Sequence, residues 1–256
     1  MPETTLPHPQ GSVAWLDMMV SAPEEALQFY QTLFGWSGEA DPNDPNSYAI
    51  QHVRGKAVAG IGAMPGGEPG MPWTGYFAVT DAEAAVGRIA QHGGGVILAA
   101  TEVPGVGKFA HGTDPSGAAF GLWQPAPFPG FELHGEPGCM SWFELVTTEG
   151  KACADFYAAL LEAEVEAMPE MPDSYWTIQV GGEPRAGIFH EESVERPHWR
   201  PYFQVADADI AVAAALAAGA HLTDEVQDTP FGRMATLLDP FGTEIKVVTP
   251  PPGTEA

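Results

Sequence analysis

The chain has 256 residues, 45% of them hydrophobic, and is therefore long enough for one large domain or two of ordinary size. Its formal net charge of −24 at pH 7 argues against binding to nucleic acids or anionic membranes, because both depend on basic residues that contact phosphate. No apolar run approaches the ~20 residues of a membrane helix, and no signal peptide is recognisable. With only two cysteines, the protein is expected to be reduced and cytoplasmic.

The first half of the chain alternates strand and helix signals. Val13–Val20 has the pattern of a β-strand. The capping-box spacing of Ser21–Glu24, with a proline in the first turn, predicts that a helix begins there. That helix has one apolar face, and two or three short strands are expected between Tyr48 and Met64.

A second round of the same signals begins at Tyr76–Val79, which is expected to be a strand. Asp81 is a candidate N-cap for a helix through Gln91, and Gly93 has the position of a left-handed C-cap. Three further strands are expected at Val96–Glu102, Lys108–Thr113 and Ala118–Trp123.

The second half of the chain repeats the first. The stretch Ala14–Tyr30 (AWLDMMVSAPEEALQFY) aligns with Ser141–Tyr157 (SWFELVTTEGKACADFY) at a shift of 127 residues, and DPSG at Asp114 aligns with DPFG at Asp239 at a shift of 125. The shift changes only in loops, which indicates a diverged duplication. We therefore predict a first module at residues 12–125, a Pro/Gly-rich linker at 126–138 and a second module at 139–249.

These features together resemble the vicinal oxygen chelate superfamily, which includes glyoxalase I, extradiol dioxygenases, fosfomycin-resistance enzymes and bleomycin-binding proteins. The resemblance covers both copies and is closest to tandem actinobacterial members labelled hydroxylase or glyoxalase-like. It rests on FYQTLFGW (Phe29–Trp36), on YFAVTD and YFQVAD (Tyr76–Asp81 and Tyr202–Asp207), and on the two DPxG endings. It implies an α+β fold of two tandem βαβββ–βαβββ modules, each an eight-stranded, cup-shaped half-barrel, related by a pseudo-two-fold axis.

Metal-binding members of this family take their ligands from three strands. The matching positions here are Trp15, Thr74 and Gly121 in the first copy, and Trp142, Arg200 and Lys246 in the second. Indole and guanidinium groups do not ligate divalent cations, and an ammonium group does so only when deprotonated. A shifted site at Glu144 and His198 would have two ligands, with cationic Arg200 beside them. We therefore expect no metal and no other cofactor.

The substituted positions of the second copy form a polar group of their own. Alternation along the strands is expected to turn six side chains toward the cup: Trp142, Glu144, His198, Arg200, Tyr202 and Lys246. In one interpretation, Arg200 and Lys246 hold an anionic or carbonyl oxygen and Trp142 stacks on a flat ligand. Glu144 and Lys246 are then the catalytic groups, with Glu144 as general base. In the other interpretation, Glu144, Arg200 and Lys246 form a satisfied buried ion cluster.

The first copy is more apolar at the matching positions. Its candidate ligand-binding residues are Trp15, Thr74, Tyr76, His111 and Trp123, and Asp17 is a candidate catalytic carboxylate. Such aromatic rings suit an aromatic or cationic ligand. Tryptophans on strands are more often part of a core than of a pocket. His111 is more often a hydrogen-bonded strand histidine than a proton carrier.

The expected function is a metal-independent cyclisation, isomerisation or proton transfer on a small carbonyl-bearing or aromatic metabolite. The alternative is a non-catalytic protein that binds and sequesters a small molecule, as drug-resistance members of the family do. A metal-dependent glyoxalase or dioxygenase is disfavoured because the ligands are missing. The expected partner is an aromatic or carbonyl-bearing, anionic small molecule, and the chain is expected to be a monomeric pseudo-dimer or a weak homodimer.

Overall fold

The computed structural model describes residues 8–40, 47–64 and 71–253. No helix in these ranges is both long and apolar enough to cross a membrane. In chain order the elements are β1 (Val13–Val20), α1 (Pro23–Phe34), β2 (Ala49–Val53), β3 (Lys56–Ala63), β4 (Met71–Ala78), α2 (Ala82–Gln91), β5 (Gly95–Val103), β6 (Gly107–Thr113), β7 (Ala119–Pro125), β8 (Met140–Thr147), α3 (Gly150–Leu161), β9 (Glu164–Ala167), β10 (Tyr175–Val180), β11 (Glu183–His190), β12 (His198–Gln204), α4 (Ala208–Ala217), β13 (His221–Thr229), β14 (Gly232–Leu238) and β15 (Glu244–Thr249).

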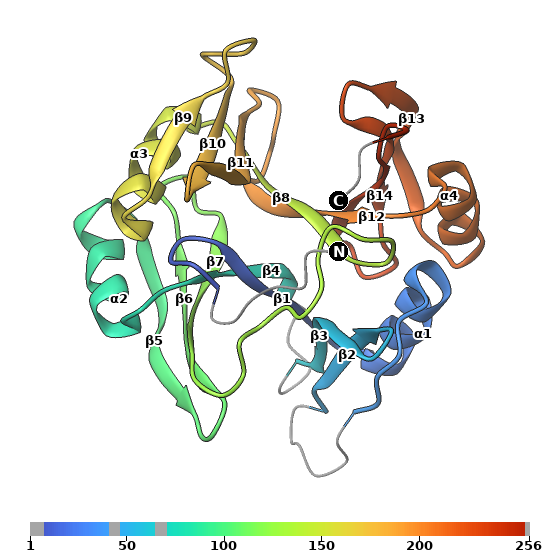
Figure 1. Cartoon of the computed structure of the whole chain (residues 1–256), viewed down its shortest axis with the longest axis horizontal. Helices are drawn as coiled ribbons and strands as arrows, with labels where there is room; N and C mark the ends of the chain where they lie inside the picture. Colours follow the sequence, from blue (N-terminus) through green and yellow to red (C-terminus); the bar gives the residue numbers. More distant parts are fainter. Residues whose placement is uncertain (1–7, 41–46, 65–70, 254–256) are drawn as a thin grey trace.

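Each copy of the repeat builds its own open, mixed sheet. The strand order is β2-β3-β1-β4-β7-β6-β5 in the first sheet and β13-β14-β15-β12-β8-β11-β10-β9 in the second. Both sheets curl without closing into a barrel (Figure 1). We call the concave face of the first sheet the first cup and that of the second sheet the second cup. The predicted α+β fold with two similar modules is confirmed.

The first sheet has one strand fewer than the predicted eight. Where the second sheet has β9, the described part of the first copy has a single bridge between Ser37 and His52. Gly38 follows, and a side chain there would collide with the backbone carbonyl of Ile50. A glycine in such a position weakens a strand, which accounts for the shorter ladder.

Of the two helix N-caps predicted from the sequence, the structure confirms one. Helix α1 has Ala22 as its N-cap, with no side-chain capping bond, so the capping box predicted at Ser21 is wrong. Pro23 opens the first turn as predicted, where its missing N–H costs nothing. Asp81 caps α2 as predicted, because its carboxylate accepts a 3.0 Å hydrogen bond from the Ala84 N–H.

The modules pack against each other through aromatic side chains on their central strands. Phe143 of β8 stacks on Trp199 of β12 with ring centroids 4.7 Å apart, and Phe77 of β4 lies 5.3 Å from Trp199. Helices α1 and α4 lie side by side at one end of this core, and α2 and α3 at the other (Figure 1). Because alternate strand residues face opposite ways, the residues between these aromatics face the cups.

The two Asp-Pro-x-Gly turns join the modules reciprocally. Tyr30 of α1 donates a 2.6 Å hydrogen bond to Asp239 Oδ2 in the second module. Tyr157 of α3 donates a 3.0 Å bond to Asp114 Oδ2 in the first. The Oδ1 atom of each aspartate accepts backbone N–H groups of its own turn. The repeated motif therefore shapes a turn and binds the other module at the same time.

Part of the predicted linker is buried in the first module. Its Phe131 N–H donates to the Ala14 carbonyl at 2.8 Å, and its Glu132 N–H donates to the Ala57 carbonyl at 2.9 Å. Phe131 is only 1% exposed. Gly130 between these contacts has φ 108°, and a side chain there would collide with the Ala14 carbonyl. The segment thus packs across the first cup, while Ala126, Pro127 and Pro137 stay exposed.

Candidate functional site

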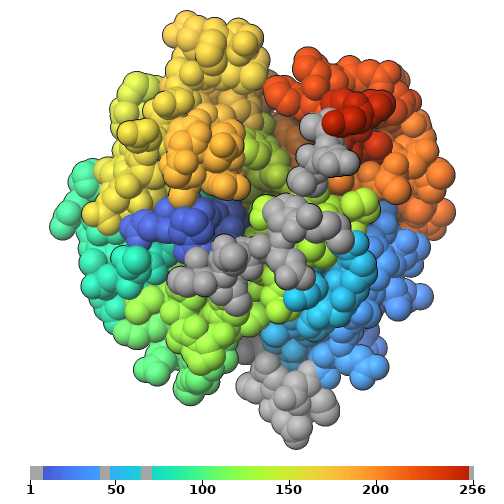
Figure 2. Space-filling view, viewed as in Figure 1, coloured from blue at the N-terminus to red at the C-terminus, as the bar shows by residue number. Residues whose placement is uncertain are grey.

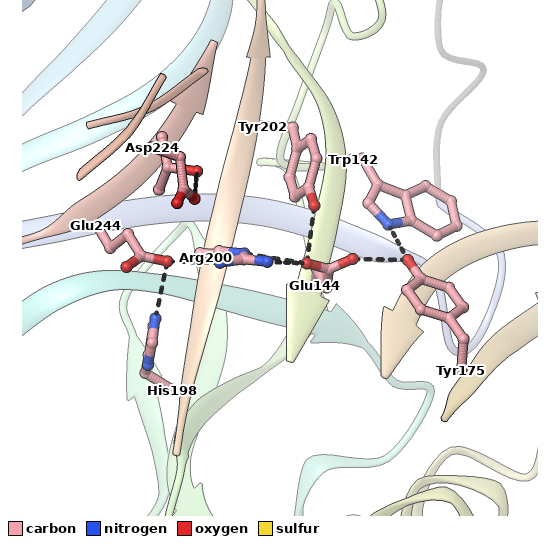
Figure 3. A network of polar contacts seen from close by, with 9 residues as sticks. Trp142, Glu144, Tyr175, His198, Arg200, Tyr202, Asp224 and Glu244 are labelled. Carbon is pink, nitrogen blue, oxygen red and sulfur yellow. Dashed lines mark hydrogen bonds and ion pairs between the residues drawn. The ribbon is translucent and has the colours of Figure 1, made fainter. Parts of the chain in front are cut away.

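A polar network covers the second cup (Figure 3). Glu144 of β8 lies at its centre and is 4% exposed. Arg200 of β12 donates to Glu144 Oε2 from Nε at 3.0 Å and from Nη2 at 2.7 Å. Tyr202 donates to the same oxygen at 2.7 Å, and Tyr175 of β10 donates to Oε1 at 2.8 Å. Both carboxylate oxygens of Glu144 are therefore occupied.

Arg200 connects this carboxylate to a second one. Its Nη1 donates to Glu244 Oε1 at 2.7 Å, and the same oxygen lies 3.4 Å from His198 Nε2. Burial opposes the charge of Glu244, but hydrogen bonds from His198 and Arg200 lower the pKa of Glu244 to about 2. Burial also opposes the charge of His198, yet its hydrogen bond with Glu244 raises the pKa of His198 above its usual value. Negative and positive groups thus alternate along the network.

His198 and Glu244 lie at the margin of the network. There they line a cleft of about 600 Å³ together with Met71 and Pro72 of the first module. His198, predicted as a ligand-binding residue, therefore lies beside an inter-module cleft and contacts the polar network at Glu244.

Lys246 of β15 is not bonded into this network. Its backbone is in register with Tyr202 of β12 and Thr236 of β14, so the three side chains share one face. Its Nζ lies 5.2 Å from the centroid of the Tyr202 ring. No described residue forms a hydrogen bond or an ion pair with this Nζ. Burial, and then the positive charge of Arg200, lower the pKa of Lys246 below its usual value.

The first cup carries a matching network. Trp15 Nε1 donates to Tyr48 Oη at 2.8 Å, and Tyr48 donates to Asp17 Oδ2 at 3.0 Å. Tyr76 donates to Asp17 Oδ1 at 3.0 Å, and its hydroxyl lies 2.9 Å from His111 Nε2. Burial raises the pKa of Asp17 to about 7 and lowers the pKa of His111 to about 4. Burial therefore favours the neutral forms of both groups in the first cup, whereas the second cup contains the cation Arg200.

The two networks follow one plan, a tryptophan and two tyrosines around a carboxylate. The matching residues are Trp15, Tyr48, Asp17 and Tyr76 in the first cup and Trp142, Tyr175, Glu144 and Tyr202 in the second. The sequence prediction missed Tyr48 and Tyr175, although the repeated Ser-Tyr pair carries them. Each tyrosine hydroxyl lies over a glycine, Gly60 or Gly187, where a side chain would collide with it.

The two networks differ at the positions that carry the metal ligands in metal-binding members of the family. Thr74 donates its hydroxyl to the Pro72 carbonyl at 3.2 Å and takes no part in the first network, whereas its counterpart Arg200 organises the second. A side chain at Gly121 would collide with the Tyr76 ring. The counterpart of Gly121 is Lys246, which packs on the Tyr202 ring instead.

The linker covers the aromatic side chains of the first cup. The Phe128 ring centroid lies 4.9 Å from that of Trp15 and 6.0 Å from that of Trp123, and Phe131 lies 5.6 Å from Trp15. Trp15 is 5% and Trp123 6% exposed, whereas Trp142 in the second cup is only half-buried. Figure 2 shows the surface hollowed between the β9–β11 lobe and the β13–β14 lobe. The predicted ligand-binding aromatics of the first cup thus pack against the protein's own chain.

Among the described residues, neither cup has side chains that suit a metal ion. In the described ranges, no three His, Cys, Asp or Glu side chains are grouped closely enough to hold one. In the second cup, the guanidinium of Arg200 binds both Glu144 and Glu244, and its charge opposes a cation there. In the first cup, Asp17 and His111 are two donors bridged by the Tyr76 hydroxyl.

Comparison with known proteins identifies the family. Residues 142–248 match the family model described as "Glyoxalase-like domain". "Putative glyoxylase CFP32" of Mycobacterium tuberculosis is 35% identical over 251 residues, which cover 95% of this chain and 96% of that protein. "Anthracycline biosynthesis protein DnrV" of Streptomyces peucetius is 36% identical over 259 residues, which cover 93% of both chains.

Solved structures share the fold at low sequence identity. The Mn(II)-bound glyoxalase of Novosphingobium aromaticivorans superposes with a TM-score of 0.65 and 15% identity, covering 93% of this chain and 82% of that one. The 2,3-dioxygenase LapB of Pseudomonas sp. KL28 superposes with a TM-score of 0.63 and 13% identity, covering 97% of both. With two curated relatives matched along nearly their whole length, this chain belongs to the glyoxalase-like proteins of the vicinal oxygen chelate superfamily.

Proposed function

We propose that the second cup is the working site and that it acts, without a metal, on a small carbonyl-bearing or aromatic metabolite. The reaction is of the isomerisation, cyclisation or proton-transfer type. Lys246 carries this proposal, because it is a partly buried cation with no hydrogen-bonding or ion-pairing partner among the described residues. Burying an ammonium group is costly unless an oxygen compensates for the lost water. A carbonyl or anionic oxygen of a ligand supplies that compensation.

The walls of the second cup suit a planar ligand. The half-buried rings of Trp142, Tyr175 and Tyr202 offer apolar faces for stacking. The relative DnrV is named for anthracycline biosynthesis, and anthracyclines are planar, carbonyl-rich ring systems. This likeness supports a planar carbonyl compound as the ligand class.

In this proposal, Glu144 and Arg200 hold the other side chains of the site in place and do not react with the ligand. Glu144 accepts four hydrogen bonds from three side chains, so its oxygens are poorly placed to take a proton from a ligand. Arg200 is bound to two carboxylates and has little freedom to move toward a ligand. The structural alternative therefore fits this pair, and the ligand-facing alternative fits Lys246.

Because the oxygens of Glu144 already accept four hydrogen bonds, Glu144 is a poor base. This favours the second candidate function, binding without catalysis. A proton-transfer reaction needs another base, and Asp224 on β13 is the described carboxylate that fits. Asp224 is exposed, accepts a 2.8 Å bond from Thr236, and its charge acts on Lys246. Product formation by the wild-type protein, lost in Asp224→Asn with ligand affinity retained, would separate the enzyme from the binding protein.

The proposal is tested by screening chelator-treated protein against planar carbonyl compounds by thermal shift, followed by calorimetry on the hits. Lys246→Met is expected to lower affinity at least tenfold while the melting temperature is kept. Lys108→Met is the matched control, because Lys108 has an ion-pair partner, Glu83, at 2.8 Å and this pair lies at an exposed position. Wild-type affinity in a folded Lys246→Met protein would contradict the proposal.

A further inference from the structure

The four lysines of the chain differ in their surroundings. Lys108 forms an ion pair with Glu83, and Lys151 forms one with Asp155, both at exposed positions. The hydrogen bond with Glu83 raises the pKa of Lys108 above its usual value. Lys246 forms no ion pair with any described residue and is partly buried.

Two of the three carboxylates whose charges act on Lys246 are already paired with a cation, and the third, Asp224, accepts a hydrogen bond from Thr236. Glu144 and Glu244 both bind Arg200, at 2.7 Å each. Arg200 also places a permanent positive charge in the same cup, 6.0 Å from the centroid of the Tyr202 ring that Lys246 packs on. Burial and a neighbouring cation lower the pKa of Lys246, so its ammonium group loses a proton to give the neutral amine more readily than that of an ordinary lysine. A neutral amine is a nucleophile, whereas an ammonium ion is not.

We propose that Lys246 forms a Schiff base with an aldehyde or an unhindered ketone held in the second cup. This inference rests on the proposed function and names its substrate class. The lone pair of Nζ attacks the carbonyl carbon and forms the C–N bond. The carbonyl oxygen takes up the two amine protons and leaves as water, so that an amine and a carbonyl compound become an imine and one water molecule. No oxidant, reductant or metal enters this step.

The imine allows isomerisation or cyclisation in the second cup even though both oxygens of Glu144 already accept hydrogen bonds. A protonated imine withdraws electrons from the neighbouring C–H bond more strongly than the parent carbonyl does, so a weaker base suffices to remove that proton. Asp224 of β13 is in register with Thr236 of β14, which is in register with Lys246 of β15. Asp224 is exposed and lies on this side of the cup. The first cup has Gly121 at the position of Lys246, so one adduct per chain is expected.

The test uses 2-naphthaldehyde as a planar aldehyde probe, with sodium cyanoborohydride to trap the imine at pH 7. Intact mass spectrometry counts the adducts, and peptide mapping locates them among the four lysines and the N-terminal amine. Lys246 is expected to be labelled at least tenfold faster than Lys108 and Lys151 of the same molecules. Lys246→Arg is expected to abolish this fast adduct, and Lys108→Arg to leave it unchanged.

The outcomes separate this inference from the function on which it rests. Labelling of Lys246 no faster than of Lys108 would overturn the Schiff base. If Lys246→Met still lost ligand affinity in that case, the non-covalent site would stand. If Lys246→Met also kept wild-type affinity, both proposals would fall. Should Lys246→Arg fold poorly, the wild-type time course alone decides, because the other lysines of the chain serve as its internal reference.

Discussion

Tyr30 of the first module and Asp239 of the second are joined by a 2.6 Å hydrogen bond, which Tyr157 and Asp114 repeat in the opposite direction at 3.0 Å. Each aspartate belongs to the turn that leads into the last strand of its module, β15 or β7. The bond from Tyr30 therefore fixes the start of the strand that carries Lys246. In each of these contacts, the helix motif of one module supplies the tyrosine and the turn motif of the other module supplies the aspartate.

Replacing Tyr30 by phenylalanine is expected to destabilise the fold. The change leaves Asp239 Oδ2 without its donor and Trp73 Nε1 without its acceptor, and both groups are buried. Two orphaned buried groups cost roughly 2–4 kcal/mol in the free energy of unfolding, measured by urea denaturation. Thr32→Ala on the same helix is the control, because its exposed hydroxyl contacts only the Gln28 carbonyl. A loss in Tyr30→Phe no larger than in the control would contradict this role.

Arg200 and Lys246 are expected to respond to mutation in opposite ways. Arg200→Met leaves buried Glu144 and half-buried Glu244 without the guanidinium that binds both, and is expected to cost about 3–5 kcal/mol of unfolding free energy. Lys246→Met removes a cation that has no described partner, so stability is expected to be kept or to rise. Equal losses in denaturant unfolding would show that Lys246 belongs to the structural cluster.

The stability of the protein should depend on pH through Asp17. Burial raises its pKa from 3.8 to about 7, although hydrogen bonds from Tyr76 and Tyr48 oppose the rise. The folded state therefore binds this proton more tightly than the unfolded state. The resulting stabilisation is complete below about pH 4 and is lost as the pH rises through about 7. Between these limits the unfolding free energy should fall by up to about 4 kcal/mol.

Asp17→Asn isolates this contribution, because the other titrating groups are the same in both proteins. Urea unfolding of the two proteins between pH 4 and pH 8 is the measurement. The stability of the wild type relative to Asp17→Asn should decline across this range. A difference that stays constant with pH would show that Asp17 keeps an ordinary pKa in the folded state.

The linker is expected to stabilise the first module without affecting the site in the second. Phe131 is 1% exposed and contacts Trp15, so Phe131→Ala should cost about 3–5 kcal/mol of unfolding free energy. Ligand affinity at the second cup should stay within about twofold of wild type by calorimetry. A second, new binding event in Phe131→Ala would instead show that the linker occupies a competent ligand site.

Much of this arrangement could be predicted from the sequence, because strand alternation acts locally. The period of two places Glu144 with Trp142 and Arg200 with Tyr202 on one face, and the structure confirms both pairs. The same rule applied to Lys246 would have found Glu244, two residues earlier on β15.

The path of the linker could not be predicted in the same way. Its Pro and Gly content indicates turns, and it says nothing about the surface on which those turns lie. The contact of Phe128 with Trp15 joins residues 113 positions apart and depends on the completed first sheet. The N-cap of α1 is Ala22, one residue after Ser21, so the local capping signal of Ser21 does not set the start of this helix.

Calorimetric titration of chelator-treated protein with a planar carbonyl ligand tests the central claim most directly. The wild type is expected to bind one ligand per chain, Lys246→Met to lose at least tenfold in affinity, and Asp17→Asn in the covered first cup to bind as the wild type does. Two ligands per chain, loss of binding on chelation, or wild-type affinity in a folded Lys246→Met protein would contradict a single metal-independent site in the second cup.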